Sequence, residues 1–151
     1  MATLDEYKEH FALFLEAGYM AVNQADEDSA IKLFKAAEIL NPDSHLPKIG
    51  YGYLHLHKLE LKKAIECFNE VLKVDPANDL AKSLLGISLS FMPEKSMEGE
   101  KVLETGIQET SDPELKKLNT MAIDFVENFV KKKPSPAELQ AEQKKTKGKT
   151  A

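Results

Sequence analysis

Four histidines, one cysteine and a short acidic run are the side chains of this sequence that could support catalysis or bind a metal ion. His55 and His57 lie two residues apart in a segment with helical periodicity, so their side chains point about 200° apart and cannot share a metal ion. His10 and His45 have no cysteine or carboxylate at the spacing that metal ligands usually show. The sequence therefore predicts no metal site.

The other reactive side chains also have structural explanations. Cys67 precedes Phe68 in an amphipathic segment, where a lone cysteine is usually a small buried residue. The acidic run from Asp26 to Asp28 is typical of a helix start. The sequence contains no glycine-rich phosphate loop and no G-x-S-x-G motif. We therefore expect no enzymatic activity and no cofactor.

The length and composition are those of one globular domain in a reducing compartment. The 151 residues include 42% hydrophobic and 30% charged side chains, and a single cysteine allows no internal disulfide. No apolar run approaches the roughly 20 residues that span a bilayer. The first ten residues carry three acidic side chains before any apolar stretch, unlike a secretory signal. These features predict a cytoplasmic protein without a membrane span.

The charge is distributed unevenly along the chain. The net charge is -5, but residues 131–151 carry seven lysines and two glutamates, which gives this end +5 and leaves -10 for residues 1–130. All 20 basic residues are lysine, and arginine, the usual side chain for bidentate contacts with phosphate or guanine, is absent. An acidic body without arginine predicts that nucleic acid is not the partner. Residues 134–151, rich in lysine, are expected to form a disordered tail, with contact to an anionic surface as the alternative.

Small, aromatic and proline residues recur at one interval. Gly18, Gly52 and Gly86 follow one another at intervals of 34 residues. The same interval separates three further pairs, namely Ala30 and Ala64, Phe34 and Phe68, and Pro42 and Pro76. This pattern resembles the tetratricopeptide repeat, a hairpin of two helices. The resemblance implies an all-α solenoid in which stacked hairpins build one continuous core.

Three hairpins are expected, in repeats of about residues 11–44, 45–78 and 79–112. The third is degenerate, because its second helix fits the pattern only with one extra residue in the turn. In that register Gly99, Leu103 and Gly106 form the small–large–small set that packs the hairpin. The predicted helices cover about residues 3–23, 27–40, 44–58, 60–74, 77–91, 95–109 and 113–132.

The last of these helices, residues 113–132, is expected to cap the array and to complete a domain of residues 1–133. Its apolar residues recur at intervals of three and four, typical of an amphipathic helix, and are Leu115, Leu118, Ala122, Phe125 and Phe129. The last repeat of a solenoid exposes an apolar face that must be covered. The sequence leaves open whether this helix caps the array or fills its groove.

The first helix of each hairpin is apolar over a wider arc than hairpin contacts require. Such helices line the concave face of the solenoid, so the additional stripe predicts a groove for an amphipathic helix or extended peptide of a protein partner. The predicted groove residues are Leu15, Tyr19, Val22, Leu46, Ile49, Tyr53, Leu56, Leu80, Ile87 and Phe91. Alternatively, a terminal helix of the chain or a second copy covers this stripe.

The apolar surface of the first helix begins before the first repeat. It includes Leu4, Tyr7 and Phe11. These residues are either part of the core or a docking site for a second, small protein.

Two segments support a closer resemblance. They are IGYGYLHLHKL at residues 49–59 and VDPANDLAKSLLG at residues 74–86. Both are similar to segments of the small repeat chaperones of bacterial type III secretion, most of all the needle-subunit chaperones. This resemblance implies a protein that pairs with a small helical co-chaperone, sequesters the amphipathic helix of a needle subunit and prevents its premature polymerisation.

Other functions remain open for such a repeat protein. A translocator-class secretion chaperone, a general adaptor or scaffold, and a self-associating subunit are the alternatives. A heat-shock adaptor is disfavoured, because repeat proteins of that class place basic and amide side chains on the inner face. Only Asn23 and His57 approach that description here.

Overall fold

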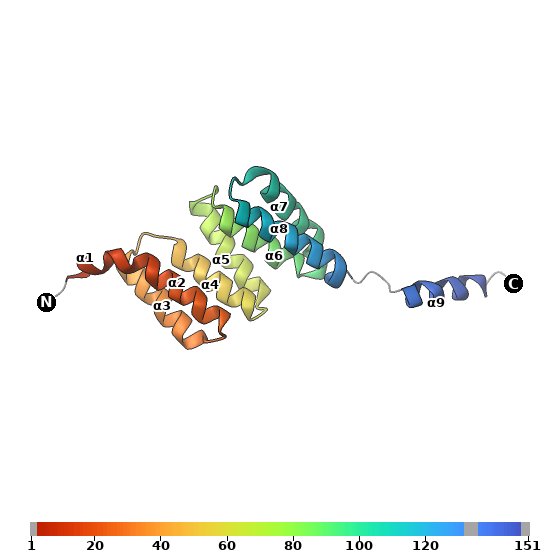
Figure 1. Cartoon of the computed structure of the whole chain (residues 1–151), viewed down its shortest axis with the longest axis horizontal. Coiled ribbons are helices and arrows are strands. Elements are labelled where there is room, and N and C mark those ends of the chain that lie inside the picture. Colours follow the sequence, from red (N-terminus) through yellow and green to blue (C-terminus); the bar gives the residue numbers. More distant parts are fainter. Residues whose placement is uncertain (1–2, 132–135, 149–151) are drawn as a thin grey trace.

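The computed structural model describes residues 3–131 and 136–148 and shows an all-α solenoid (Figure 1). Within these two ranges there is no strand, so the predicted fold class is confirmed. The α-helices are α1 (Leu4–Tyr7), α2 (Phe11–Asn23), α3 (Glu27–Leu40), α4 (Leu46–His57), α5 (Leu61–Val74), α6 (Asp79–Ser90), α7 (Ser96–Glu109), α8 (Pro113–Phe125) and α9 (Pro136–Lys147). Two 3-10 segments cover Lys8–His10 and Pro93–Lys95, and a π-helix covers Val126–Val130.

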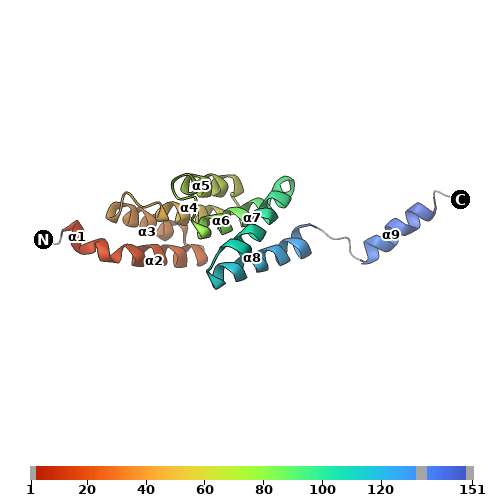
Figure 2. The same ribbon diagram turned by 90° about the horizontal axis from the view of Figure 1, so that it is seen from above.

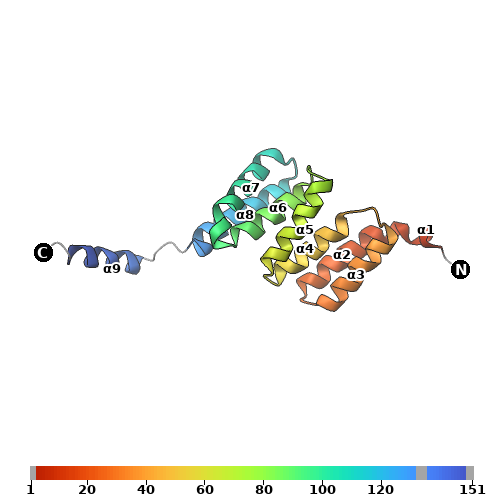
Figure 3. The ribbon, with the colours of Figure 1, turned by 180° about the vertical axis from the view of Figure 1, so that it is seen from behind.

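Consecutive helices form three antiparallel hairpins, α2–α3, α4–α5 and α6–α7, and each hairpin stacks on the next. Helix α8 packs on α6 and α7 at the end of the row. Seen from above, α2 and α8 lie on one side of the row and α5 lies on the other (Figure 2). Seen from behind, the three hairpins follow one another in chain order along the array (Figure 3). The row therefore places α2, α4, α6 and α8 along one inner face.

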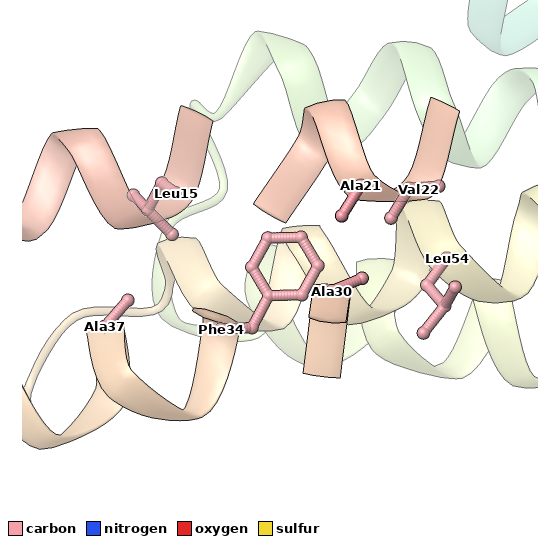
Figure 4. Close-up of a cluster of buried hydrophobic side chains, with 7 residues drawn as sticks. All are labelled: Leu15, Ala21, Val22, Ala30, Phe34, Ala37 and Leu54. Carbon is pink, nitrogen blue, oxygen red and sulfur yellow. The ribbon is translucent and has the colours of Figure 1, made fainter. Parts of the chain in front are cut away.

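Phe34 joins the first two hairpins. Its ring lies at the centre of a buried cluster from α2, α3 and α4 (Figure 4). A Cβ atom built on either Gly18 of α2 or Gly50 of α4 would lie 2.7 Å from Cδ1 of this ring. Any larger residue at these two positions would therefore clash with the ring. Gly50 has no glycine counterpart 34 residues away, and the repeat pattern therefore did not identify it. The second hairpin uses the same contact, with Phe68 against Gly52.

The third hairpin is held by backbone contact. Leu103 is fully buried against Gly86, as the predicted register requires. Gly99 faces the backbone of Ser90 and Gly86, and Gly106 faces the side chain of Asn119 on α8. The degenerate repeat therefore keeps the hairpin geometry by bringing two helical backbones together.

Two of the hairpins are closed by the same turn. Ala25 follows α2 and Leu59 follows α4, and both adopt the left-handed backbone conformation, with φ of 59° and 58°. The next position at this interval is Pro93, whose ring fixes φ near about -65° and excludes this turn. The 3-10 segment over Pro93–Lys95 replaces it, and this accounts for the extra residue in the third repeat.

Replacement of Gly99 by alanine is expected to lower the free energy of unfolding by up to about 2 kcal/mol. Alanine improves helix propensity by about 1 kcal/mol, but its Cβ would lie 2.7 Å from the carbonyl oxygen of Gly86, and over-packing of this kind costs about 1–3 kcal/mol. Urea denaturation measures the difference. Gly106→Ala is the matched control with a smaller loss, because its Cβ meets a side chain and no backbone atom. A Gly99→Ala variant that is more stable than the wild type would contradict the close approach of α6 and α7.

Helix α8 packs only in part through the predicted stripe, of which Leu115, Leu118 and Ala122 are half-buried. Asn119 is the fully buried residue of α8, and Val126 of the π-helix that follows is also fully buried. Asn119 Nδ2 donates a hydrogen bond to the Leu103 carbonyl at 3.4 Å. Phe125 and Phe129, predicted to cover the last repeat, are exposed. Gly106 provides the space that admits the polar Asn119 side chain, which no apolar periodicity reveals.

The carboxy-terminal segment contains one further helix. Within the tail predicted over residues 134–151, Pro136–Lys147 form α9. Alanine, glutamate, glutamine and lysine dominate this segment and are strong helix formers. Residues 134, 135 and 149–151 of the predicted tail and residue 132 of the predicted capping helix lie outside the described residues. In the described part of the chain, every helix is too short or too polar to span a bilayer.

Candidate functional site

The inner face contains an open apolar groove of about 630 Å³. Its walls come from α2, α4, α6, α8 and the turn after α4. The lining residues are Tyr19, Tyr53, Leu56, His57, Leu59, Leu80, Leu84, Ile87, Phe91 and Leu118. None of these side chains is an amine or a carboxylate, so the groove offers apolar and aromatic contact.

Six of the predicted groove residues meet in this groove. They are Tyr19, Tyr53, Leu56, Leu80, Ile87 and Phe91. These six residues come from α2, from α4, and from α6 with the residue that follows it, and the groove lies towards the carboxy-terminal half of the array.

The other four predicted residues do not line the groove. Leu15 and Val22 are buried in the cluster around Phe34, and Ile49 is buried in the cluster of the second hairpin. Their positions on the inner helices turn them towards neighbouring helices, where they form core. Leu46, at the start of α4, is exposed outside the groove lining.

The sequence interpretation missed three apolar lining residues. Leu84 belongs to both the core and the groove wall. Leu118 was assigned to the capping stripe, and its position on α8 shows that this helix closes one side of the groove without filling it. Leu59 lies in a turn, where helical periodicity gives no indication of its direction. His57, noted only as a polar exception, also borders the groove.

Two tyrosines form a preorganised aromatic wall. The rings of Tyr19 and Tyr53 meet edge to face with centroids 5.3 Å apart, and Tyr53 contacts His57 at 4.6 Å. Tyr53 Oη donates a hydrogen bond to Asn23 Oδ1 at 2.6 Å, which fixes the ring between α4 and α2. Burial raises the pKa of Tyr19 to about 12 and also raises the pKa of Tyr53. Both rings are therefore neutral at physiological pH and present apolar faces.

Charged residues at the turn beside the groove are paired with one another. Lys58 lies 2.7 Å from Glu27 and 2.8 Å from Glu60, and Glu60 also accepts from Lys63 at 3.1 Å. The Lys58 and Lys63 hydrogen bonds lower the pKa of Glu60 to about 2. His55 Nδ1 lies 2.9 Å from the same carboxylate. This network leaves an electrostatically balanced turn beside an apolar groove.

The apolar surface continues from the groove onto α8. Phe91 at the end of α6 contacts Phe125 with ring centroids 5.8 Å apart, and Phe125 contacts Phe129 at 5.0 Å. Met121 is exposed on α8, and Phe129 lies on the π-helix Val126–Val130 that continues it. The α8 surface, defined by Met121, Phe125 and Phe129, is therefore continuous with the groove through Phe91.

The amino-terminal apolar residues divide into two kinds. Leu4 and Tyr7 are exposed, whereas Phe11 is half-buried and packs against the cluster around Phe34. Two of the three predicted docking residues thus remain available on the surface.

Apart from His57, which borders the groove, the candidates for chemistry lie outside its lining. In residues 3–131 and 136–148, no three histidine, cysteine, aspartate or glutamate side chains are arranged to hold a metal ion. Cys67 is half-buried on α5, and burial raises the pKa of its thiol. Asp26 accepts a hydrogen bond from the Ser29 backbone at 3.1 Å and so caps α3, as the acidic run predicted.

Comparisons of the chain with protein-family models, with curated proteins and with solved structures found no match. The functional argument therefore depends on the repeat pattern and on the groove.

Proposed function

We propose that this protein binds an amphipathic helix of another polypeptide in the inner groove. The observation that carries the proposal is the groove itself, an open apolar channel of about 630 Å³ walled by four helices that all belong to one stack. A helix with apolar residues at intervals of three and four presents a stripe that complements such a groove. Soluble monomeric proteins rarely expose a contiguous apolar surface to water, and such surfaces usually mark interaction sites.

The lining supports tight but reversible association. Burial of apolar surface contributes about 25 cal/mol per Å², from which the costs of ordering the ligand are subtracted. Tyr19 and Tyr53 are fixed by their mutual contact and by Asn23, so they lose little side-chain entropy on binding. Rigid aromatic side chains of this kind are frequent anchors in protein interfaces.

The resemblance noted in the sequence gives this activity a specific form. We infer a cytoplasmic type III secretion chaperone that sequesters the helix of a needle subunit and prevents premature polymerisation. The exposed Leu4 and Tyr7 supply a separate apolar surface for a small helical co-chaperone. A translocator-class chaperone or a general adaptor would use the same groove for a different ligand.

A self-associating subunit is a second candidate function. The α8 surface supports it, because Phe129 is 71% exposed and Met121 is 60% exposed next to the groove. In that case two copies would bury this surface against each other.

Co-expression with the needle subunit of the same cell tests the proposal. A soluble complex of defined stoichiometry, in which the subunit stays unpolymerised, is the expected result. Sedimentation analysis of the chain alone is the control for self-association. A chain that forms concentration-dependent oligomers, and leaves the subunit free to polymerise, would support the second candidate.

The variant Tyr53→Ala is expected to weaken binding of the apolar helix by about 1–3 kcal/mol while the fold is retained. Truncation removes both the ring in the groove and its contact with Tyr19. Isothermal titration with the helical ligand measures the loss. Tyr53→Phe is the matched control, because it removes only the hydrogen bond to Asn23 and keeps the ring. Equal affinities for Tyr53→Ala and the wild type would remove this side chain from the site.

A further inference from the structure

Two turns of the array share one hydrogen-bonding pattern but differ in their central side chain. After α2, the Ala25 amide donates to the Val22 carbonyl at 3.0 Å and the Asp26 amide donates to the Ala21 carbonyl at 2.9 Å. After α4, the Leu59 amide donates to Leu56 at 3.0 Å and the Glu60 amide donates to His55 at 2.9 Å. This is the Schellman arrangement, in which the left-handed residue is usually glycine.

A leucine at such a position is unfavourable for folding. The left-handed conformation brings Cβ close to the following carbonyl oxygen, a cost that glycine avoids. Burial does not offset this cost at Leu59, because its side chain is 71% exposed. The equivalent turn is built with alanine at Ala25, so the turn itself does not require a large apolar side chain.

Leu59 lies between two neighbouring hollows of the surface. Leu59 borders the groove and also borders a second cavity of about 380 Å³, which Leu61 and Met92 help to line. The side chain therefore forms the rim between two adjoining hollows. The flanking Lys58 and Glu60 are paired with each other at 2.8 Å, so an apolar ligand meets no unpaired charge from either residue.

We propose that Leu59 is a specificity-determining contact of the groove, a rim residue that packs on the apolar stripe of the bound helix. Contact with the ligand accounts for a leucine side chain in this unfavourable backbone conformation. This inference rests on the proposed function and identifies a contact that the helical periodicity of the sequence does not predict. The inference also predicts a property of the ligand. Its apolar stripe must be wide enough for side chains at the edge of the stripe to contact Leu59 at the groove rim.

The test compares Leu59→Gly with Ala25→Gly in the full chain. Glycine adopts the left-handed conformation without the steric cost of a Cβ atom, so both variants are expected to raise Tm by about 1–4 °C. The binding probe is a synthetic amphipathic peptide of about 18 residues, five helical turns, with leucine at intervals of three and four. Leu59→Gly is expected to weaken its binding about 5- to 20-fold, the loss of one partly buried leucine contact. Ala25→Gly is expected to bind like the wild type.

A second variant separates the side chain from backbone flexibility. Leu59→Asn keeps a residue that tolerates the left-handed conformation and removes the apolar contact, so it is expected to lose affinity to the same extent as Leu59→Gly. Equal binding by the wild type, Leu59→Gly and Leu59→Asn would overturn the inference and leave the proposed function standing. Absence of binding by the wild type would reject the proposed function and this inference together.

Discussion

Replacement of Phe34 by alanine is expected to lower the free energy of unfolding by about 3–5 kcal/mol. The ring is fully buried and fills the space between Gly18 and Gly50, so truncation leaves a cavity that two bare helical backbones cannot close. Domains of this size have a total stability of about 5–15 kcal/mol. Because hairpins in a solenoid are stabilised by their neighbours, the first repeat should separate from the array before the rest unfolds.

Urea denaturation followed by circular dichroism measures this loss, and hydrogen exchange shows where it occurs. Phe129→Ala is the matched control, because the same atoms are removed from a side chain that is 71% exposed. The control is expected to change the free energy of unfolding by less than about 0.5 kcal/mol. Similar losses for the two variants would mean that Phe34 does not join the hairpins.

The variant Ile87→Asp is expected to reduce binding of an apolar helix about 100-fold or more. Ile87 lies on α6 and lines the groove together with the two tyrosines and Phe91. A bound apolar helix would bury the new carboxylate without a partner, and burial of an unpaired charge is strongly unfavourable. A 100-fold loss corresponds to about 2.7 kcal/mol.

Ile39→Asp is the matched control for this effect. Ile39 lies on α3, outside the groove lining, and is 63% exposed, so the same substitution places a carboxylate in water. Fluorescence anisotropy with a labelled amphipathic peptide measures both affinities, and circular dichroism checks that each variant remains helical. If Ile87→Asp unfolds, Ile87→Ala tests the position with a smaller loss. Unchanged binding by a folded Ile87 variant would place the ligand elsewhere, and the α8 surface is then the next candidate.

The sequence by itself determined the architecture. Helix periodicity and the 34-residue interval of glycine, alanine and phenylalanine depend on contacts within one hairpin or between neighbours, so they are visible along the chain. The contacts of Phe34 with Gly18 and of Phe68 with Gly52 follow this rule. The third hairpin does too, once one residue is added to its turn, and Pro93 supplies the reason for that addition.

Only the tertiary structure decided which apolar residues face the groove. Leu15, Val22 and Ile49 lie on the same inner helices as Tyr19 and Tyr53. Their side chains point in a different direction around the helix axis, and this places them in the core. On α8, the polar Asn119 is buried against Gly106 while Phe125 is exposed, the reverse of what hydrophobicity predicts.

The rim of the groove required the structure for a different reason. Leu59 acquires its direction from a positive φ, and this backbone angle leaves no periodic signal in the sequence. Periodicity reports which residues repeat along a helix, whereas the groove depends on how helices rotate about their axes and on where turns direct their side chains. Those rotations are set by side-chain volumes at contacts between helices, and they bring residues as distant in the sequence as Tyr19 of α2 and Leu118 of α8 into one groove lining.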